Sequence, residues 1–227
     1  MSNNKKIIHK YCEYGAYVLE LSPEVISPGG DTEKICNIIE GRCSKSRVGM
    51  VVGCGAGLIP LVLSGLCEVL YATDINPHAV ELTRSNLAKN NVSNCEVAQG
   101  DLFGPFSEMQ FDLIVANLPQ MPVALDQEQN NLIALAHDGG KSGREVLDKF
   151  IVNLPKKLTS KRGKAIFSNF DYLGLNQTAE LLDSLSLKGT VLEQYKHKLG
   201  EVSYHVNLLG EHNFGSEFSV SIIEASV

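Results

Sequence analysis

The stretch Val48–Gly57, VGMVVGCGAG, decides how this chain is interpreted. It begins as a continuous apolar run, which is typical of a strand covered on both faces of a parallel sheet. Glycines then stand at every second position, at Gly53, Gly55 and Gly57. Glycine tolerates a positive φ and has no Cβ, so this turn allows backbone to lie close to a bound ligand. The next residues, Leu58–Leu66, predict a helix whose first N–H groups face that ligand.

Three glycines at this spacing leave two interpretations open. One is a tight turn between a strand and a helix that binds nothing, and the other is a ligand-binding turn. The spacing G-x-G-x-G also differs from the G-x-G-x-x-G pattern of dinucleotide-binding turns. The choice between these two interpretations therefore depends on the segments that follow the turn.

Length and composition favour one soluble α/β domain. The chain has 227 residues, of which 44% are hydrophobic and 20% are charged, as is ordinary for a globular protein with a substantial core. We find no apolar run long enough for a membrane span and no signal-peptide pattern, which predicts a cytoplasmic protein. The net charge of −6 disfavours broad attraction to nucleic acid. The six cysteines include no C-x-x-C pair, so we expect reduced thiols and no metal site.

The order of the predicted elements indicates a doubly wound parallel sheet. Tyr11–Val25 is compatible with a short helix or a pair of strands. Strands and helices then alternate, which favours parallel strands joined by right-handed crossovers. The end of the chain, with the runs VSYHVNLLG and FSVSIIEA, predicts an antiparallel hairpin. Beyond the first strand, the predicted strands are 68–74, 95–98, 111–116 and 164–170, and the predicted helices are 33–40, one starting at Pro77, 143–158 and 177–187.

Polar side chains follow three of these strands, at the edge of the sheet where ligands bind in such folds. Asp74 stands at the distance from the glycine turn that is expected of a ribose-binding acid, or it caps the helix that starts at Pro77. Asp101 can reach an adenine amino group while Leu102 packs on the ring, or it forms a local turn. Asn117 ends its strand where the reactive end of the ligand would lie. Before the 33–40 helix, Asp31 or Thr32 is expected as the cap.

The segments VVGCGAG, ATDINPHAV, QGDLFGPF and FDLIVANLPQ, in this order and spacing, resemble the class I S-adenosylmethionine-dependent methyltransferases. More narrowly, they resemble the HemK-type amino methyltransferases, which methylate the side-chain amide of glutamine in release factors. SPGGDTEKICNII and LAHDGGKSGREVLDKFIVNLPKKL are similar to two further segments of that subgroup. The resemblance implies a Rossmann-like, mainly parallel seven-stranded sheet with a C-terminal antiparallel hairpin in one compact domain. Residues 1–45 would cover the substrate and cofactor, and residues 46–227 would form the catalytic domain.

The resemblance also implies a set of site residues. The glycine turn would lie against the methionine part of S-adenosylmethionine, Asp74 would hold the ribose, and Ile75 would pack on the adenine. Thr32 would lie near the carboxylate end of the cofactor. The implied cofactor-binding residues are Thr32, Gly53, Cys54, Gly55, Gly57, Asp74, Ile75, Asp101, Leu102 and Asn117. The implied catalytic residues, which would face the transferred methyl, are Asn117, Leu118, Pro119 and Gln120.

The chain departs from the pattern of this subgroup in three ways. Val51 stands where the family has an acid that helps to bind the cofactor's amino group. The sequence Asn117-Leu118-Pro119-Gln120 replaces N-P-P-Y, and glutamine cannot stack on a planar acceptor as tyrosine can. Only some forty residues precede the first strand, so the helical domain that docks the release factor is not expected.

These departures give four hypotheses. The first is a methyltransferase that acts on a nitrogen, or another heteroatom such as a thioether sulfur, of a small-molecule or amino-acid-type acceptor. The second is protein glutamine methylation. The third is methylation of a nucleic-acid base, which is disfavoured because no stacking group adjoins Asn117 in the sequence. The fourth is a non-catalytic, cofactor-binding partner subunit. His137 and Asp138 can contact the substrate, or His137 is a surface-loop histidine, and the oligomeric state is not indicated.

Overall fold

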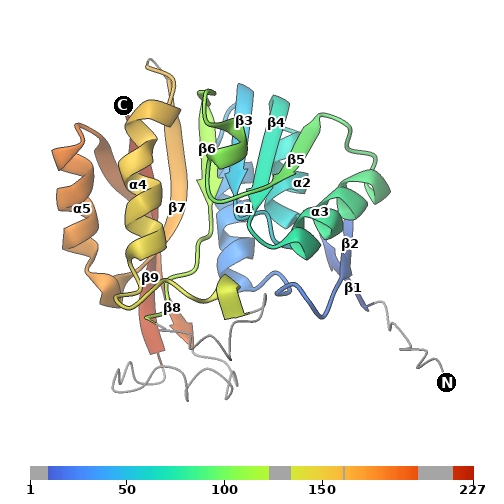
Figure 1. The fold of residues 1–227 in the computed structure, drawn as a ribbon, viewed down its shortest axis with the longest axis horizontal. Helices are drawn as coiled ribbons and strands as arrows, with labels where there is room; N and C mark the ends of the chain where they lie inside the picture. Colours follow the sequence, from blue (N-terminus) through green and yellow to red (C-terminus); the bar gives the residue numbers. More distant parts are fainter. Residues whose placement is uncertain (1–9, 123–133, 161, 199–216) are drawn as a thin grey trace.

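The computed structural model describes residues 10–122, 134–160, 162–198 and 217–227. These residues form a seven-stranded sheet with helices on both faces and a separate two-stranded hairpin (Figure 1). The hairpin consists of β1 (Lys10–Tyr14) and β2 (Tyr17–Leu21). The sheet strands are β3 (Ser46–Val52), β4 (Cys67–Asp74), β5 (Cys95–Gln99), β6 (Leu113–Ala116), β7 (Lys164–Phe170), β8 (Lys188–Lys198) and β9 (Glu217–Ser226). The α-helices are α1 (Gly30–Arg42), α2 (Leu58–Ser64), α3 (Pro77–Lys89), α4 (Glu145–Lys157) and α5 (Leu175–Ser184), and the 3₁₀ turns are η1 (Gly104–Phe106), η3 (Ala134–Ala136) and η4 (Asp171–Leu173).

The strand order is β5-β4-β3-β6-β7-β9-β8, which confirms the predicted architecture. The five strands from β5 to β7 run parallel, and β9 pairs antiparallel with both β7 and β8. The chain winds outward from β3 to β5 and then returns to β6 on the other side of β3. The crevice at the carboxyl ends of β3 and β6 is therefore the place where ligands bind in such sheets.

Two hydrophobic layers hold the sheet between its helices (Figure 1). Buried residues of α1, α2 and α3 form a core on one face, and buried residues of α4 and α5 contribute to a core on the other. Neighbouring residues in β3 divide between these cores, because side chains alternate across a strand. Val51 belongs to the α1–α3 layer and Val52 to the α4–α5 layer. This two-sided burial explains why β3 reads as a continuous apolar run.

The start of α1 differs from the prediction. The N-cap residue is Gly29, which makes no side-chain cap hydrogen bond, instead of Asp31 or Thr32. The reason is that both side chains have partners on other elements. Asp31 accepts hydrogen bonds from β8, and Thr32 accepts one from Asn117.

The two ends of the described chain refine the predicted elements. Of the two alternatives for Tyr11–Val25, the strand pair is confirmed, as β1 and β2. The C-terminal hairpin is also confirmed, with FSVSIIEA inside β9, but the described partner of β9 is β8. The other predicted run, residues 202–210, lies outside the described residues. In the described part of the chain, no helix has the length and apolar character that crossing a membrane requires.

Candidate functional site

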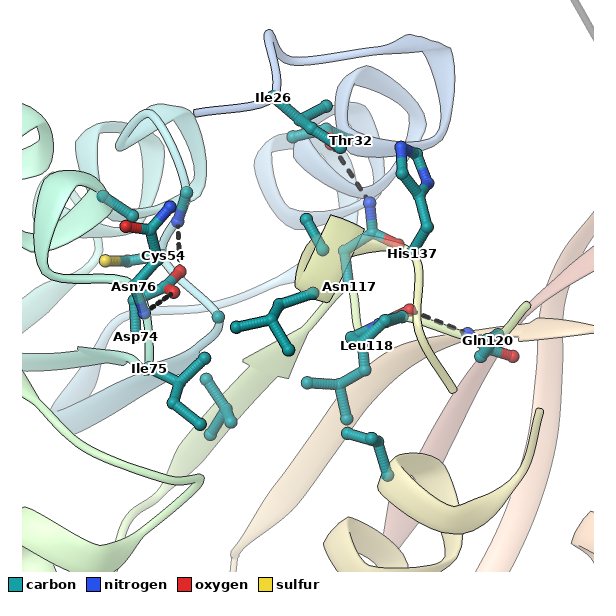
Figure 2. Close-up of a pocket in the computed structure, with 18 of the residues that line it drawn as sticks. Ile26, Thr32, Cys54, Asp74, Ile75, Asn76, Asn117, Leu118, Gln120 and His137 are labelled. Carbon is teal, nitrogen blue, oxygen red and sulfur yellow. Dashed lines mark hydrogen bonds between the residues drawn. The ribbon is translucent and has the colours of Figure 1, made fainter. Parts of the chain in front are cut away.

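A cavity of about 510 Å³ lies at the carboxyl ends of β3, β4 and β6 (Figure 2). Its volume falls within the range of small-molecule sites. The segment before α1 and the first turn of α1 line part of it, from Val25 to Thr32. Every residue predicted to contact the cofactor lines this cavity except Gly57, and so do Leu118, Pro119 and Gln120.

The glycine turn adopts the backbone that only glycine adopts readily. The φ angles of Gly53, Gly55 and Gly57 are 77°, 53° and 93°. A Cβ on Gly55 would meet nothing within 4 Å, so the backbone there stands open. A Cβ on Gly57 would lie 3.2 Å from Thr83 of α3. Of these three glycines, Gly53 and Gly55 line the cavity, and Gly57 allows α2 to pack closely against α3.

Asp74 is fixed at the end of β4, beside the glycine turn. Its Oδ2 accepts the Gly55 N–H at 2.9 Å, and its Oδ1 accepts the Asn76 N–H at 2.9 Å. Burial raises the pKa of the carboxyl group, and these N–H donors act in the opposite direction. A carboxylate has about four acceptor positions, so the carboxylate can still accept from a ligand hydroxyl. The alternative role as the cap of α3 belongs to Asn76, whose side chain accepts the His78 N–H.

Two apolar side chains extend the cavity beyond Asp74. Ile75 is 52% exposed and projects into the cavity in Figure 2, where it offers a surface for a flat ring. Leu102 has a φ of 47°, which is uncommon outside glycine, and its carbonyl accepts the Thr73 hydroxyl at 2.7 Å. Asp101 lines the cavity, but its carboxylate also pairs with Lys149 at 2.5 Å. Asp101 thus has a partner that the sequence did not indicate.

Asn117 is held by a directional chain of hydrogen bonds. The Phe170 N–H donates to Gln120 Oε1 at 2.8 Å, so Gln120 Nε2 points the other way. That nitrogen donates to the carbonyl and the hydroxyl oxygens of Ser168, at 3.1 and 3.2 Å. The single proton of the Ser168 hydroxyl then goes to Asn117 Oδ1, at 2.8 Å. Asn117 Nδ2 in turn donates to Thr32 Oγ1 at 3.1 Å. We call the chain from Gln120 through Ser168 and Asn117 to Thr32 the amide relay.

Gln120, the last of the predicted catalytic residues, has a buried side chain. The residue is 1% exposed, and its amide hydrogen-bonds to β7 and, at 3.4 Å, to the Leu118 carbonyl. Figure 2 shows the Gln120 amide beside the Leu118 carbonyl, to which it donates. The Gln120 side chain thus ties the segment after Asn117 to β7.

Three rings from distant parts of the chain line the same cavity beyond Asn117. Phe170 ends β7, and His197 and Phe218 are directly paired across β8 and β9. The ring centroids of Phe170 and Phe218 are 4.9 Å apart, and so are those of His197 and Phe218. We call these three residues the aromatic wall. No stacking group adjoins Asn117 in the sequence, but these three rings line the same cavity as Asn117.

The ring of His197 is anchored to α1. Its Nδ1 lies 2.9 Å from Asp31 Oδ1, which also accepts the Tyr195 hydroxyl at 2.7 Å. The hydrogen bond to Asp31 raises the pKa of His197. Since Thr32 holds Asn117 and its neighbour Asp31 holds His197, the first turn of α1 positions both groups. Sequence reasoning missed Asp31, Ser168 and His197 in these roles.

The remaining predicted residues have simpler surroundings. Cys54 is 4% exposed, and burial raises the pKa of its thiol, so this side chain stays a protonated, apolar contact. Val51 is fully buried in the core. His137 lines the cavity, and its carbonyl accepts the Met121 N–H at 2.9 Å. Of the irregular segment between Gln120 and His137, residues 123–133 lie outside the described residues.

These features fit an S-adenosyl nucleoside. The carboxylate of Asp74 can accept from a ribose hydroxyl, and Ile75 offers apolar surface for adenine. The open backbone at Gly55 leaves room for the amino-acid part. The donor and acceptor atoms of the cavity thus suit the cofactor that the sequence implied.

Comparisons with known proteins identify the family of the chain. The family model "Methyltransferase small domain" matches residues 36–164, more than half of the chain. A candidate protein N5-glutamine methyltransferase of Methanocaldococcus jannaschii is 33% identical over 180 residues, which are 78% of this chain and 88% of the relative. A release factor glutamine methyltransferase of Moorella thermoacetica is 30% identical over 63% of this chain, and the match covers 53% of that relative.

A solved structure supports the fold. The Mtq2–Trm112 complex of E. cuniculi, described as responsible for methylation of the eRF1 translation termination factor, contains a chain that matches with a TM-score of 0.64. It is 20% identical and the match covers 89% of this chain and 98% of that chain. With the family model and the Methanocaldococcus relative, the conclusion is that the chain belongs to the methyltransferase small domain family and is an S-adenosylmethionine-dependent methyltransferase.

Proposed function

We propose that this methyltransferase transfers a methyl group to the side-chain amide nitrogen of a glutamine in a protein. The residues proposed to bind the cofactor are those of the glycine turn, Asp74, Ile75 and Leu102. Asn117 is proposed to bind the acceptor, with Leu118 and Pro119 shaping the wall around it. The N-terminal part of the described chain covers the cavity.

This proposal rests mainly on the hydrogen-bonding groups of Asn117 that are not used within the described part of the protein. An asparagine amide has two N–H donors and two acceptor lone pairs. In the described structure one N–H is used by Thr32 and one lone pair by Ser168. One N–H donor and one acceptor lone pair therefore remain on the same amide. A primary amide is the complement of this pair, since its carbonyl accepts and its N–H donates.

The protein contributes positioning to the reaction. When bound, S-adenosylmethionine supplies a methyl group on a sulfonium sulfur. Asn117 orients the amide plane of the acceptor so that its nitrogen faces the methyl, and the Leu118 carbonyl can accept a second N–H. Leu118 is 7% exposed and Met121 is 8% exposed, so these side chains help to keep water from the reacting nitrogen. Correct alignment and water exclusion are the main demands of such a displacement.

The relatives change the order of the hypotheses. Glutamine methyltransferases are among the relatives with the broadest coverage, which favours a protein acceptor over the small-molecule acceptor that the sequence analysis put first. The net charge of −6 remains unfavourable for a nucleic-acid acceptor. The small-molecule acceptor is therefore tested as the alternative.

The experiment measures S-adenosylhomocysteine formation with a set of acceptors. The set contains a peptide with an exposed glutamine, the same peptide with glutamate in its place, free glutamine, and a thioether compound. We expect product only with the glutamine peptide, and fragmentation mass spectrometry should place the methyl on its side-chain nitrogen. Methylation of the small molecules alone would contradict a protein acceptor.

A further inference from the structure

We infer that the aromatic wall of Phe170, His197 and Phe218 is the subsite that recognises the planar amide of the acceptor, with His197 as its specificity-determining residue. This inference rests on the proposed function and assigns a binding surface to the acceptor end of the cavity. The position of the wall, its chemistry and its anchoring to α1 each support this assignment.

The wall continues the surface on which Asn117 lies. Ala116, the last residue of β6, pairs with Phe167 of β7, so Asn117 lies beside Ser168, to which it is hydrogen-bonded. Phe170 follows two residues later on the same face of β7, since side chains alternate along a strand. An acceptor held by Asn117 therefore has Phe170 next to it along the strand.

A second connection reaches the wall from α1. Thr32 contacts Asn117 at 3.1 Å, and the adjacent Asp31 contacts His197 at 2.9 Å. Two consecutive residues thus fix the acceptor-binding amide and the imidazole relative to each other. His197 lies at the acceptor end of the cavity, away from the Asp74 end that suits the nucleoside.

The chemistry of the wall suits a flat, polar group. The faces of aromatic rings pack well against planar amides, and the imidazole adds a polar atom at the edge. Asp31 accepts a hydrogen bond from Nδ1 of His197, so this nitrogen carries a proton. The other ring nitrogen, Nε2, is the one left to face a ligand. Asp31 and the side chain of His197 are 13% and 31% exposed. The ring is consequently held in one orientation while part of it stays accessible.

The test compares two substitutions of similar size at the same position. His197→Phe keeps a planar ring, whereas His197→Leu keeps apolar bulk without one. We expect His197→Leu to raise the KM for the glutamine peptide by about threefold to tenfold, the usual range for one aromatic contact. The kcat should fall by less than about twofold. His197→Phe should stay within about threefold of the wild type in KM. The control His78→Ala removes a histidine of α3 that does not line the cavity.

Two further measurements separate recognition from a structural role. Calorimetry with S-adenosylhomocysteine and thermal denaturation check that both variants keep their cofactor affinity and fold. Titration of the glutamine peptide into the protein saturated with S-adenosylhomocysteine should show the same weakening for His197→Leu as the KM does. An unchanged KM in His197→Leu, with an active wild type, would overturn this inference alone. A wild type that methylates no glutamine peptide would overturn the proposed function together with it.

Discussion

Ser168→Ala is the substitution that tests the amide relay most sharply. Ser168 is 1% exposed, and its hydroxyl both accepts from Gln120 and donates to Asn117. Alanine removes this hydroxyl and leaves Asn117 Oδ1 without its anchor. A hydrogen bond of this kind contributes about 1 kcal/mol net, and a buried group left without its partner costs about 1–3 kcal/mol. The Asn117 amide would then rotate about its side-chain torsion, and only a fraction of molecules would present the acceptor correctly.

We expect kcat with the glutamine peptide to fall by about tenfold, as a loss of about 1.4 kcal/mol predicts. The affinity for S-adenosylhomocysteine should change less than about twofold, since Ser168 is outside the nucleoside half of the cavity. The assay is steady-state kinetics beside calorimetry and thermal denaturation.

Ser221→Ala is the matched control for this experiment. Ser221 is a fully buried serine on the neighbouring strand β9, and its hydroxyl accepts from Gln194 at 3.3 Å. It lies outside the amide relay, so its loss should change the melting temperature without changing kcat. If Ser168→Ala and Ser221→Ala have the same kcat, the relay does not orient Asn117 and the reasoning is refuted.

Three other predictions follow from the same geometry. Asp74→Ala should weaken the binding of S-adenosylhomocysteine more than about tenfold, the loss expected for charge-assisted hydrogen bonds; unchanged affinity in calorimetry would remove Asp74 from the site. Asn117→Ala should reduce kcat at least about tenfold and leave cofactor affinity nearly intact; normal turnover would overturn its role. The His197–Asp31 pair should stabilise the fold at lower pH, because the hydrogen bond raises the pKa of His197 in the folded state. This contribution is complete below the ordinary histidine pKa and disappears as the pH rises through the raised value. Since the ring is partly exposed, its size is about 1 kcal/mol or less, and the melting temperatures of wild type and His197→Phe should converge with rising pH; a constant difference would contradict it.

Much of the fold could be predicted because its signals are local. The apolar run of β3, the glycine turn and the alternation of strands and helices each lie within a short stretch of sequence. The start of α1 was less predictable, because Asp31 and Thr32 look like capping residues and only their distant partners show otherwise. The pairing of β9 with β8 was likewise beyond local patterns.

The candidate site divides in the same way. Asp74 and Asn117 could be found because each ends a recognisable strand at the ligand-binding edge of the sheet. Ser168 and the aromatic wall could not, because only the packing of β7, β8 and β9 brings Ser168 against Asn117 and the three rings to the cavity. Gln120 was identified by its position after Asn117, but its burial against β7 gives it a positioning role.

A crystal structure of the protein with S-adenosylhomocysteine and a glutamine peptide tests the central claim most directly. The account predicts the ribose hydroxyls on Asp74, the sulfur directed towards Asn117, and the glutamine amide hydrogen-bonded to Asn117. A nucleoside bound elsewhere, or a peptide glutamine that does not reach Asn117, would contradict it.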